Sequence, residues 1–337
     1  MWSVLGHDSA VQYLSRCLEA GRLSHAYLLA GPAHVGKTTL ALNLAQAVNC
    51  VQKERPCGLC PSCLRTGEGH HPDVVQVAVR EDHAEIAIDD VRDLQRLASL
   101  TPFLGPWRVF IIQQAELMSL EAANCLLKTI EEPPEKVLIL LLTSQPDLLP
   151  ATVLSRCHVL KLYPMPIVKI EEALTARWGA AEGMARLLAR LSRGCLGRAI
   201  AFSQESGLLE ARSRQMQRIA SLTSAALLER FDHARETAFL LGRDRSFARD
   251  AVELWASWWR DLLLMKEGET ESIENLDLSD EMVKEAATIS IRDILGVLRA
   301  LQETREALES NANPRLALEV LMLSLPAGTR SLLAPSL

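Results

Sequence analysis

The sequence predicts an α/β domain built on a five-stranded parallel sheet, followed by segments that are helical throughout. Two observations support this prediction. Five short apolar runs, bounded by turn residues, alternate with helical patterns up to about residue 165. Beyond that point the apolar residues recur at helical spacing. Strands that alternate with helices are typical of a parallel sheet covered on both faces, so we expect three layers.

The expected elements can be placed in order along the chain. An amphipathic helix is expected within residues 1–25, before the first strand. Asp89 is expected to cap the helix that follows the second strand, because an Asp side chain accepts hydrogen bonds from the first turn. The pair Pro133-Pro134 ends the helix before the fourth strand. The expected strands are residues 26–30, 73–79, 108–112, 137–143 and 159–162.

The first strand runs into Gly31-Pro32-Ala33-His34-Val35-Gly36-Lys37-Thr38, which satisfies G-x-x-x-x-G-K-[ST]. The glycines let the backbone curl so that its N–H groups point at a polyphosphate. The lysine would reach the β and γ phosphates, the threonine would hold Mg²⁺, and the helix start adds its positive end. The predicted ligand is ATP or ADP with Mg²⁺. The residues expected to bind it are Gly31, Gly36, Lys37, Thr38 and Thr39.

The strand at residues 108–112 is followed by Gln113-Gln114, where a phosphate-loop ATPase normally has an Asp and then a Glu. The Asp anchors Mg²⁺ through water and the Glu polarises the attacking water, and a neutral amide can do neither. The nearest carboxylate, Glu116, is expected on the solvated face of the next helix. The sequence therefore predicts nucleotide binding without the groups that hydrolyse the nucleotide.

Four of the eight cysteines crowd into residues 50–63: Cys50, Cys57, Cys60 and Cys63. Two overlapping C-x₂-C steps with Gly or Pro in or beside them suit tetrahedral thiolate binding of Zn²⁺. All four thiolates would be used, so the predicted zinc is structural. The alternative is that these cysteines are unliganded small apolar side chains. His71 is expected in the turn into the second strand and not as a ligand.

Composition excludes several function classes. The net charge of −6 argues against a general basic surface that wraps DNA. The N-terminus has no signal-like pattern and the longest apolar run, residues 137–142, is too short to span a bilayer, so we expect a soluble, cytoplasmic chain without a membrane partner. No basic residues are interleaved with Trp255, Trp258 and Trp259, so we expect them to pack in a core or subunit contact and not to stack on bases.

Taken together, these residues resemble one known family, the AAA+ subunits of the bacterial clamp loader, which belongs to the DNA polymerase III holoenzyme. The resemblance extends over essentially the whole chain. It rests on Val4-Leu5-Gly6-His7, residues 23–29, the phosphate loop, the four cysteines, residues 123–134, Ser155-Arg156-Cys157 and residues 313–319. It implies an AAA+ module at residues 1–165 with a zinc-binding insertion at 50–63, a helical lid at 166–207 and a helical C-terminal oligomerisation domain, the collar, at 208–337.

Two members of that family compete. The motor type, gamma/tau, hydrolyses ATP, whereas the stator type, delta-prime, mostly does not. His71-Pro72-Asp73, Ala122-Ala123-Asn124 and Gln113-Gln114 resemble the stator type. The phosphate loop is whole, unlike that of many delta-prime chains, so the resemblance implies nucleotide binding with little turnover. Gly197 stands where motor subunits carry a phosphate-sensing Arg, and Arg198 comes one residue late.

The resemblance implies one catalytic role, that of Arg156. An Arg on the rim of an AAA+ domain can reach a neighbour's nucleotide and stabilise charge on its γ-phosphate, as an arginine finger in trans. The alternative is an Arg in a surface salt bridge. The implied function is that of a stator without intrinsic activity, which helps load the sliding clamp onto primer–template DNA at the replisome. The implied partners are gamma/tau and delta in a heteropentameric ring. The alternative function is an ATP-hydrolysing gamma/tau-type motor.

Overall fold

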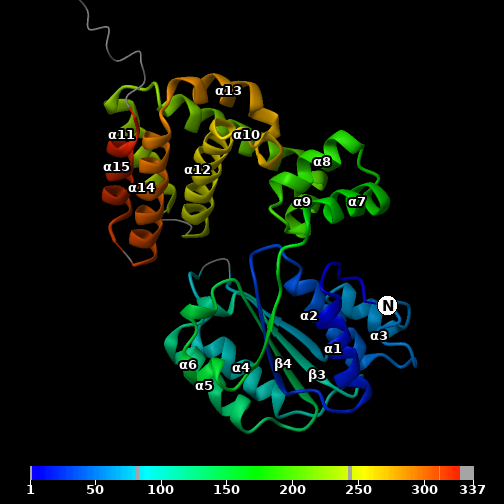
Figure 1. Ribbon diagram of the computed structural model, residues 1–337. Helices are drawn as coiled ribbons and strands as arrows, with labels where there is room; N and C mark the ends of the chain where they lie inside the picture. Colours follow the sequence, from blue (N-terminus) through cyan, green and yellow to red (C-terminus); the bar gives the residue numbers. More distant parts are fainter. Residues whose placement is uncertain (1, 81–82, 242–244, 311, 327–337) are drawn as a thin grey trace, which may run out of the picture. The chain divides into compact units, whose positions relative to one another are not determined.

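The chain forms two compact units (Figure 1). The computed structural model describes residues 2–80, 83–241, 245–310 and 312–326. The first unit, here the sheet unit, comprises Met1–Pro166 and Gly194–Arg198; the second, the helical unit, comprises Ile167–Arg193 and Ala199–Leu337. The expected collar falls within the helical unit, and so does the expected lid except for Pro166 and Gly194–Arg198, which belong to the sheet unit. The boundary at residue 207 stays a prediction.

The sheet unit contains the predicted five-stranded parallel sheet. Its strands are β1 (Ala26–Ala30), β2 (Val74–Val77), β3 (Arg108–Ile112), β4 (Val137–Thr143) and β5 (His158–Lys161), in the order β2-β3-β4-β1-β5. All four pairings are parallel. The second strand is shorter than expected. The five-stranded parallel α/β module predicted from the sequence is confirmed.

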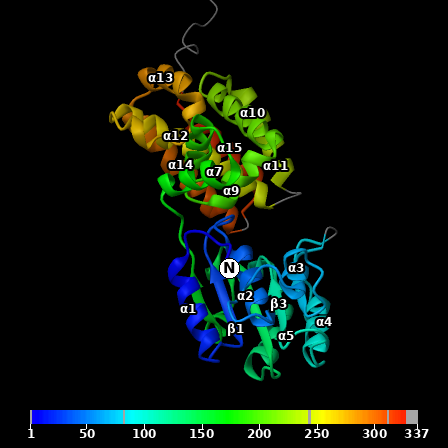
Figure 2. The same cartoon turned by 90° about the vertical axis from the view of Figure 1, so that its right-hand side faces the viewer.

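Helices cover both faces of this sheet (Figure 2). Along β1, Tyr27 and Leu29 join the apolar core formed with α1 and α2, whereas Ala26 and Leu28 join the core formed with α4, α5 and α6. Successive side chains of a strand point to opposite faces, so an apolar run is buried on both sides. The helices are α1 (Asp8–Glu19), α2 (Lys37–Asn49), α3 (Pro61–Gly67), α4 (Ile88–Ala98), α5 (Leu120–Glu131) and α6 (Ala151–Leu154).

The helical unit has its own core, in which Trp255, Trp258 and Trp259 are buried. Packing of these tryptophans, as predicted from the sequence, is therefore confirmed. The helices are α7 (Ile167–Trp178), α8 (Glu182–Leu191), α9 (Leu196–Gln204), α10 (Ser206–Leu222), α11 (Leu227–Leu241), α12 (Arg245–Lys266), α13 (Ser279–Thr288), α14 (Ile291–Glu309) and α15 (Pro314–Ser324). Among the described residues, no helix combines the length and the apolar character needed to cross a membrane.

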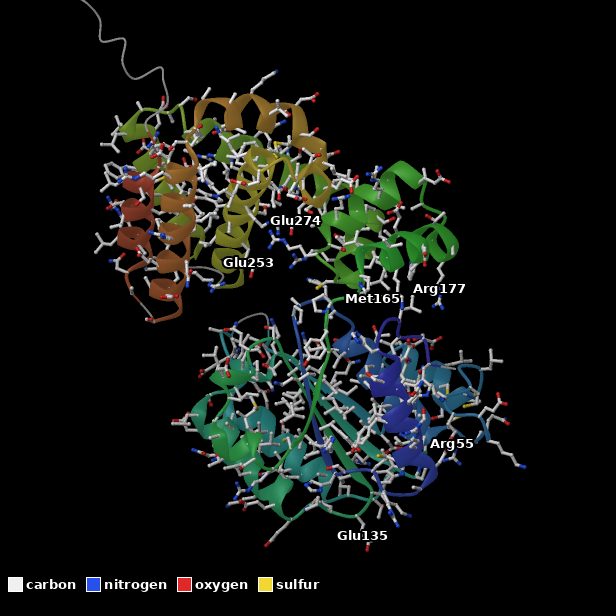
Figure 3. All side chains as sticks on the ribbon, in the orientation of Figure 1. Arg55, Glu135, Met165, Arg177, Glu253 and Glu274 are labelled. Carbon is white, nitrogen blue, oxygen red and sulfur yellow. The ribbon has the colours of Figure 1, made fainter. Side chains whose placement is uncertain are left out.

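Within the helical unit, Arg193 joins the end of α8 to the later helices. Its Nε lies 2.8 Å from Oε2 of Glu274, and one of its terminal nitrogens lies 3.8 Å from a carboxylate oxygen of Glu253. Figure 3 labels both glutamates. These ion pairs connect the helices of the expected lid to those of the expected collar, which is consistent with their assignment to one unit.

A buried ion pair fixes the loop between α4 and β3. The fully buried carboxylate of Asp73 accepts hydrogen bonds from the backbone N–H groups of Phe103 (2.6 Å), Leu104 (2.7 Å) and Gly105 (2.9 Å), and it pairs with Arg108 at 3.2 Å. Burial by itself would raise the pKa of Asp73. The three N–H groups and the Arg108 guanidinium more than offset that effect, so the pKa lies below its ordinary value.

The expectation that Asp89 caps α4 is wrong. The helix begins at Ile88 with Ala87 at the N-cap, and Asp89 lies in the first turn. Asp90 accepts a hydrogen bond from the backbone N–H of Ala87 at 3.0 Å through its side chain. Asp90 is the third residue of the helix, and its side chain reaches back to the backbone N–H of the N-cap residue. This hydrogen bond lets the helix start earlier than the sequence pattern indicates.

Replacing Asp73 with Asn should destabilise the sheet unit by about 3 kcal/mol at pH 7, because it leaves the buried guanidinium of Arg108 unpaired. Hydrogen exchange of the β2 and β3 amides measures this loss. The folded-state pKa of Asp73 is depressed, so its contribution is complete above the unfolded pKa of about 3.9. It disappears as the pH falls through the lower folded-state pKa.

The matched control is Asp89→Asn, which removes an exposed carboxylate from the first turn of α4. A surface change of this kind should alter the free energy of unfolding by about 0.5 kcal/mol or less. Equal losses in the two variants would contradict the role assigned to the buried pair.

Candidate functional site

The candidate site lies at the carboxyl ends of the strands. Figure 3 marks the two ends of the sheet unit: Glu135 precedes β4 at one end, and Met165 follows β5 at the other. The phosphate loop follows β1 and belongs to the second end. Its first glycine continues the pairing of β1 with β4, because the N–H of Gly31 donates to the carbonyl of Thr143 at 3.1 Å.

Both glycines of the phosphate loop meet a steric requirement. Gly36 has a φ of +115° at the N-cap of α2, a backbone conformation that side chains disfavour. A Cβ at Gly31 would lie 2.4 Å from the carbonyl oxygen of Leu162. Gly36 is therefore required by the left-handed backbone of the turn, and Gly31 by the close approach of the Leu162 backbone.

The structure brings the expected phosphate-binding residues together around the start of α2. Lys37 folds back over the loop, and its Nζ donates to the carbonyls of Gly31 (2.6 Å) and Pro32 (2.7 Å). Thr38 and Thr39 lie in the first turn with exposed side chains. Backbone N–H groups of a helix start, a lysine and two accessible hydroxyls are the groups that a polyphosphate and its metal would contact.

Two segments distant in sequence support the loop. The buried His7 places Nε2 2.8 Å from the carbonyl oxygen of Val35, to which it donates. The backbone N–H of Gly197 donates to the carbonyl of His34 at 3.0 Å, and a Cβ at Gly197 would lie 2.7 Å from that oxygen. The glycine at this position thus has a packing reason, because any side chain would collide with the backbone of the phosphate loop.

The two glutamines at the end of β3 do not replace a pair of acids. The side-chain amide of Gln113 donates to Gln76 of β2 at 2.8 Å. Because β2 and β4 flank β3, this contact lies on the side of β3 away from the phosphate loop. Gln114 is exposed and has a φ of +47°. The sequence could not indicate that the Gln113 side chain is directed toward β2.

The expectation for Glu116 is wrong. It lies in the 3₁₀ turn η1 (Ala115–Leu117), not on the solvated face of a helix. Its Oε1 accepts from both the backbone N–H (3.1 Å) and the hydroxyl (2.7 Å) of Ser144, which directly follows β4. Burial lowers the pKa of Lys37, and the negative charge of Glu116 partly opposes that decrease. A carboxylate therefore acts on the lysine of the phosphate loop.

The four clustered cysteines come together in three dimensions. Their sulfur atoms all lie within 4.8 Å of one another; Cys57 and Cys63 are 3.9 Å apart, and Cys50 and Cys60 are 4.0 Å apart. Four thiolates about 2.3 Å from a tetrahedral zinc would be separated by about 3.8 Å. The cluster therefore fits a metal ion, and of the described residues it is the one group that offers such a ligand set.

The surroundings favour a thiolate at Cys57, whereas burial raises the pKa of the Cys63 thiol to about 12. The backbone N–H groups of Leu59 and Cys60 donate to the sulfur of Cys57, and they lower the pKa of that thiol to about 6. His71 is occupied elsewhere: its Nδ1 accepts from the N–H of Asp73 (3.1 Å), so its Nε2 donates to the hydroxyl of Ser62 (3.0 Å). The expectation that this histidine is not a ligand agrees with these contacts.

Arg156 is exposed on the surface of the sheet unit. Its Nε pairs with Glu131 at the end of α5 at 2.7 Å, and another guanidinium nitrogen donates to the carbonyl of Thr152 at 3.0 Å. The Arg156 side chain retains 40% exposure in this arrangement. It is held by groups that a stronger anion could displace.

The chain thus combines a parallel α/β unit, with a phosphate-loop motif at the carboxyl ends of its strands, and a helical unit. Residues 6–166 match the family described as "DNA polymerase III, delta subunit", and residues 207–326 match "DNA polymerase III, delta subunit, C terminal". The chain therefore belongs to the delta-type family of DNA polymerase III subunits.

Individual relatives agree with this assignment. DNA polymerase III subunit delta' of Bacillus subtilis is 28% identical over 94% of this chain and 95% of its own length. Subunit tau of Escherichia coli is 34% identical over 60% of this chain, but the match spans only 32% of tau. In structure, the chain is similar to a gamma subunit-related protein of Thermotoga maritima, over 92% of this chain and 98% of that protein, at 18% identity and with a TM-score of 0.44.

Proposed function

We propose that this chain is a delta-prime-type stator of the bacterial replicative clamp loader, acting in the cytoplasm with gamma/tau and delta to place the sliding clamp on primer–template DNA. It binds ATP or ADP with Mg²⁺ and hydrolyses little of it. The observation that carries the proposal is the contrast within one domain. The phosphate loop is complete, whereas Gln113 and Gln114 occupy the positions of the hydrolytic acids.

In this proposal Arg156 is the chain's contribution to catalysis, in the nucleotide site of the neighbouring subunit. Its exposure and its planar guanidinium support that role, because a bidentate fork matches the oxygens of a γ-phosphate. The pair with Glu131 would hold the guanidinium until the neighbour's phosphate replaces the carboxylate. The four cysteines hold a structural Zn²⁺ and leave no position open for chemistry.

Replacing Arg156 with Ala in a reconstituted clamp loader should depress DNA-stimulated hydrolysis without preventing assembly. Where a trans arginine has been measured it contributes about 10³–10⁵ in rate. Single-turnover hydrolysis in the adjacent motor site should therefore fall by about a hundredfold or more. Arg156→Lys should not restore it, because an ammonium lacks the fork.

The matched control for this experiment is Arg92→Ala, which removes another exposed arginine paired with a carboxylate, at 2.9 Å from Asp89. It should leave turnover unchanged. If Arg156→Ala assembled and hydrolysed ATP at the normal rate, the arginine-finger role would have to be abandoned.

The isolated chain should bind nucleotide but turn it over very slowly. Equilibrium binding of ADP and ATP, followed by single-turnover hydrolysis, measures both properties on one preparation. Lys37→Ala should abolish binding, because it removes the ammonium that faces the phosphates. Steady hydrolysis by the isolated chain that disappears in Lys37→Ala would instead identify a gamma/tau-type motor.

Metal analysis of the purified chain should find about one equivalent of zinc, since four thiolates complete the coordination of one ion. Cys60→Ser should lower that content, because it removes one of the buried ligands. Cys125→Ser is the matched control: Cys125 lies outside the cluster and donates to Gln95. A zinc content far below one equivalent in the unaltered chain would rule out the assignment.

A further inference from the structure

Glu116 occupies a position next to the phosphate loop that its sequence neighbours do not reveal. It lies just beyond β3, and its hydrogen-bond partner Ser144 lies just beyond β4. β4 is paired with β1, and it ends at Thr143, the residue before Ser144. The carbonyl of Thr143 accepts a hydrogen bond from the backbone N–H of Gly31, the first residue of the phosphate loop. The carboxylate is thus one strand away from the loop, at the same end of the sheet.

The two oxygens of this carboxylate differ. Oε1 accepts both hydrogen bonds from Ser144, which fixes the side chain. Oε2 is buried and has no hydrogen-bond partner among the residues that the structure describes. A buried carboxylate oxygen without a donor is costly, and the charge it carries is available to interact with a cation.

The negative charge of Glu116 acts on Lys37. The ammonium of Lys37 is satisfied by the carbonyls of Gly31 and Pro32, and burial lowers its pKa while Glu116 opposes that decrease. In an interior of low effective dielectric, one fixed negative charge also acts on whatever the loop binds. It repels a bare polyphosphate and attracts a divalent cation.

We infer that Glu116 makes this site select magnesium-bound nucleotide over metal-free nucleotide. The inference rests on the proposed nucleotide binding and names the form of ligand that is bound. Gln113 and Gln114 cannot supply this selectivity, because they are neutral. Glu116 contributes a single carboxylate that Ser144 holds through Oε1, and the unpartnered Oε2 supplies the negative charge that attracts the metal.

The test is the metal enhancement factor of the purified chain, defined as the dissociation constant of ADP in EDTA divided by that in excess Mg²⁺. Glu116→Gln keeps the shape and removes the charge. It should tighten ADP binding in EDTA and weaken it in Mg²⁺, so that the factor falls about tenfold. Glu116→Ala repeats the measurement if the Gln variant does not fold.

One control separates the Glu116 charge from carboxylates elsewhere. Glu121→Gln removes an exposed carboxylate from the start of α5 and should leave the factor unchanged. A fall in Glu121→Gln as large as that in Glu116→Gln would assign the effect to the overall charge of the chain and overturn the inference.

Three further outcomes would overturn the inference. The first is a folded, neutral Glu116 variant that keeps the original factor. The second is an unaltered chain that binds ADP equally well with and without Mg²⁺, and the third is an unaltered chain that does not bind ADP. The first of these outcomes leaves the stator function in place, because that function is tested through Arg156 in the assembled loader. Conversely, a normal rate in the Arg156→Ala loader would not affect the result for Glu116.

Discussion

The parallel pairing of β4 between β3 and β1 is the constraint on which the candidate site depends. It brings three turns that are far apart in the sequence to one end of the sheet: the phosphate loop after β1, Ser144 after β4 and Glu116 after β3. The register places Thr143 opposite Ala30, so β4 reaches as far as the start of the phosphate loop. A shift of one residue would turn every side chain of β4 to the other face and separate these groups.

The same arrangement sets the electrostatics of the site. Lys37 is partly buried, and backbone carbonyls satisfy its ammonium. A typical phosphate-loop ATPase balances the lysine and the metal with two acids. This chain has one carboxylate near its lysine, held by Ser144, and a pair of amides at the strand end. In the proposed function, this balance of charges favours retention of a nucleotide over its cleavage.

Most of the architecture could be predicted from the sequence, because its signals are local. Buried strands appear as short apolar runs, the phosphate loop has a fixed spacing, and Cys57, Cys60 and Cys63 lie within seven residues, so their proximity needs no long-range information. The cap of α4 was predicted wrongly because Asp90 reaches back to Ala87, a choice between adjacent acids that spacing does not resolve.

Other features depend on contacts between distant segments, and the sequence could not reveal them. Glu116 follows the strand in a pattern that resembles a helix start, and its partner Ser144 is 28 residues away. Gly197 looked like a missing sensor arginine, whereas the structure shows that the backbone of His34 leaves no room for a side chain there. In both cases a segment remote in sequence determines the role of the residue.

The segment Gly194–Arg198 determines how the chain can be divided into fragments. These five residues belong to the sheet unit, although the residues on both sides belong to the helical unit. The polypeptide therefore crosses between the units three times. A fragment that ended at residue 166 would lose the N–H donor of Gly197 and the buried side chain of Cys195. The sheet unit is consequently not a separable N-terminal piece, because its phosphate loop is contacted by residues synthesised after the first helices of the helical unit.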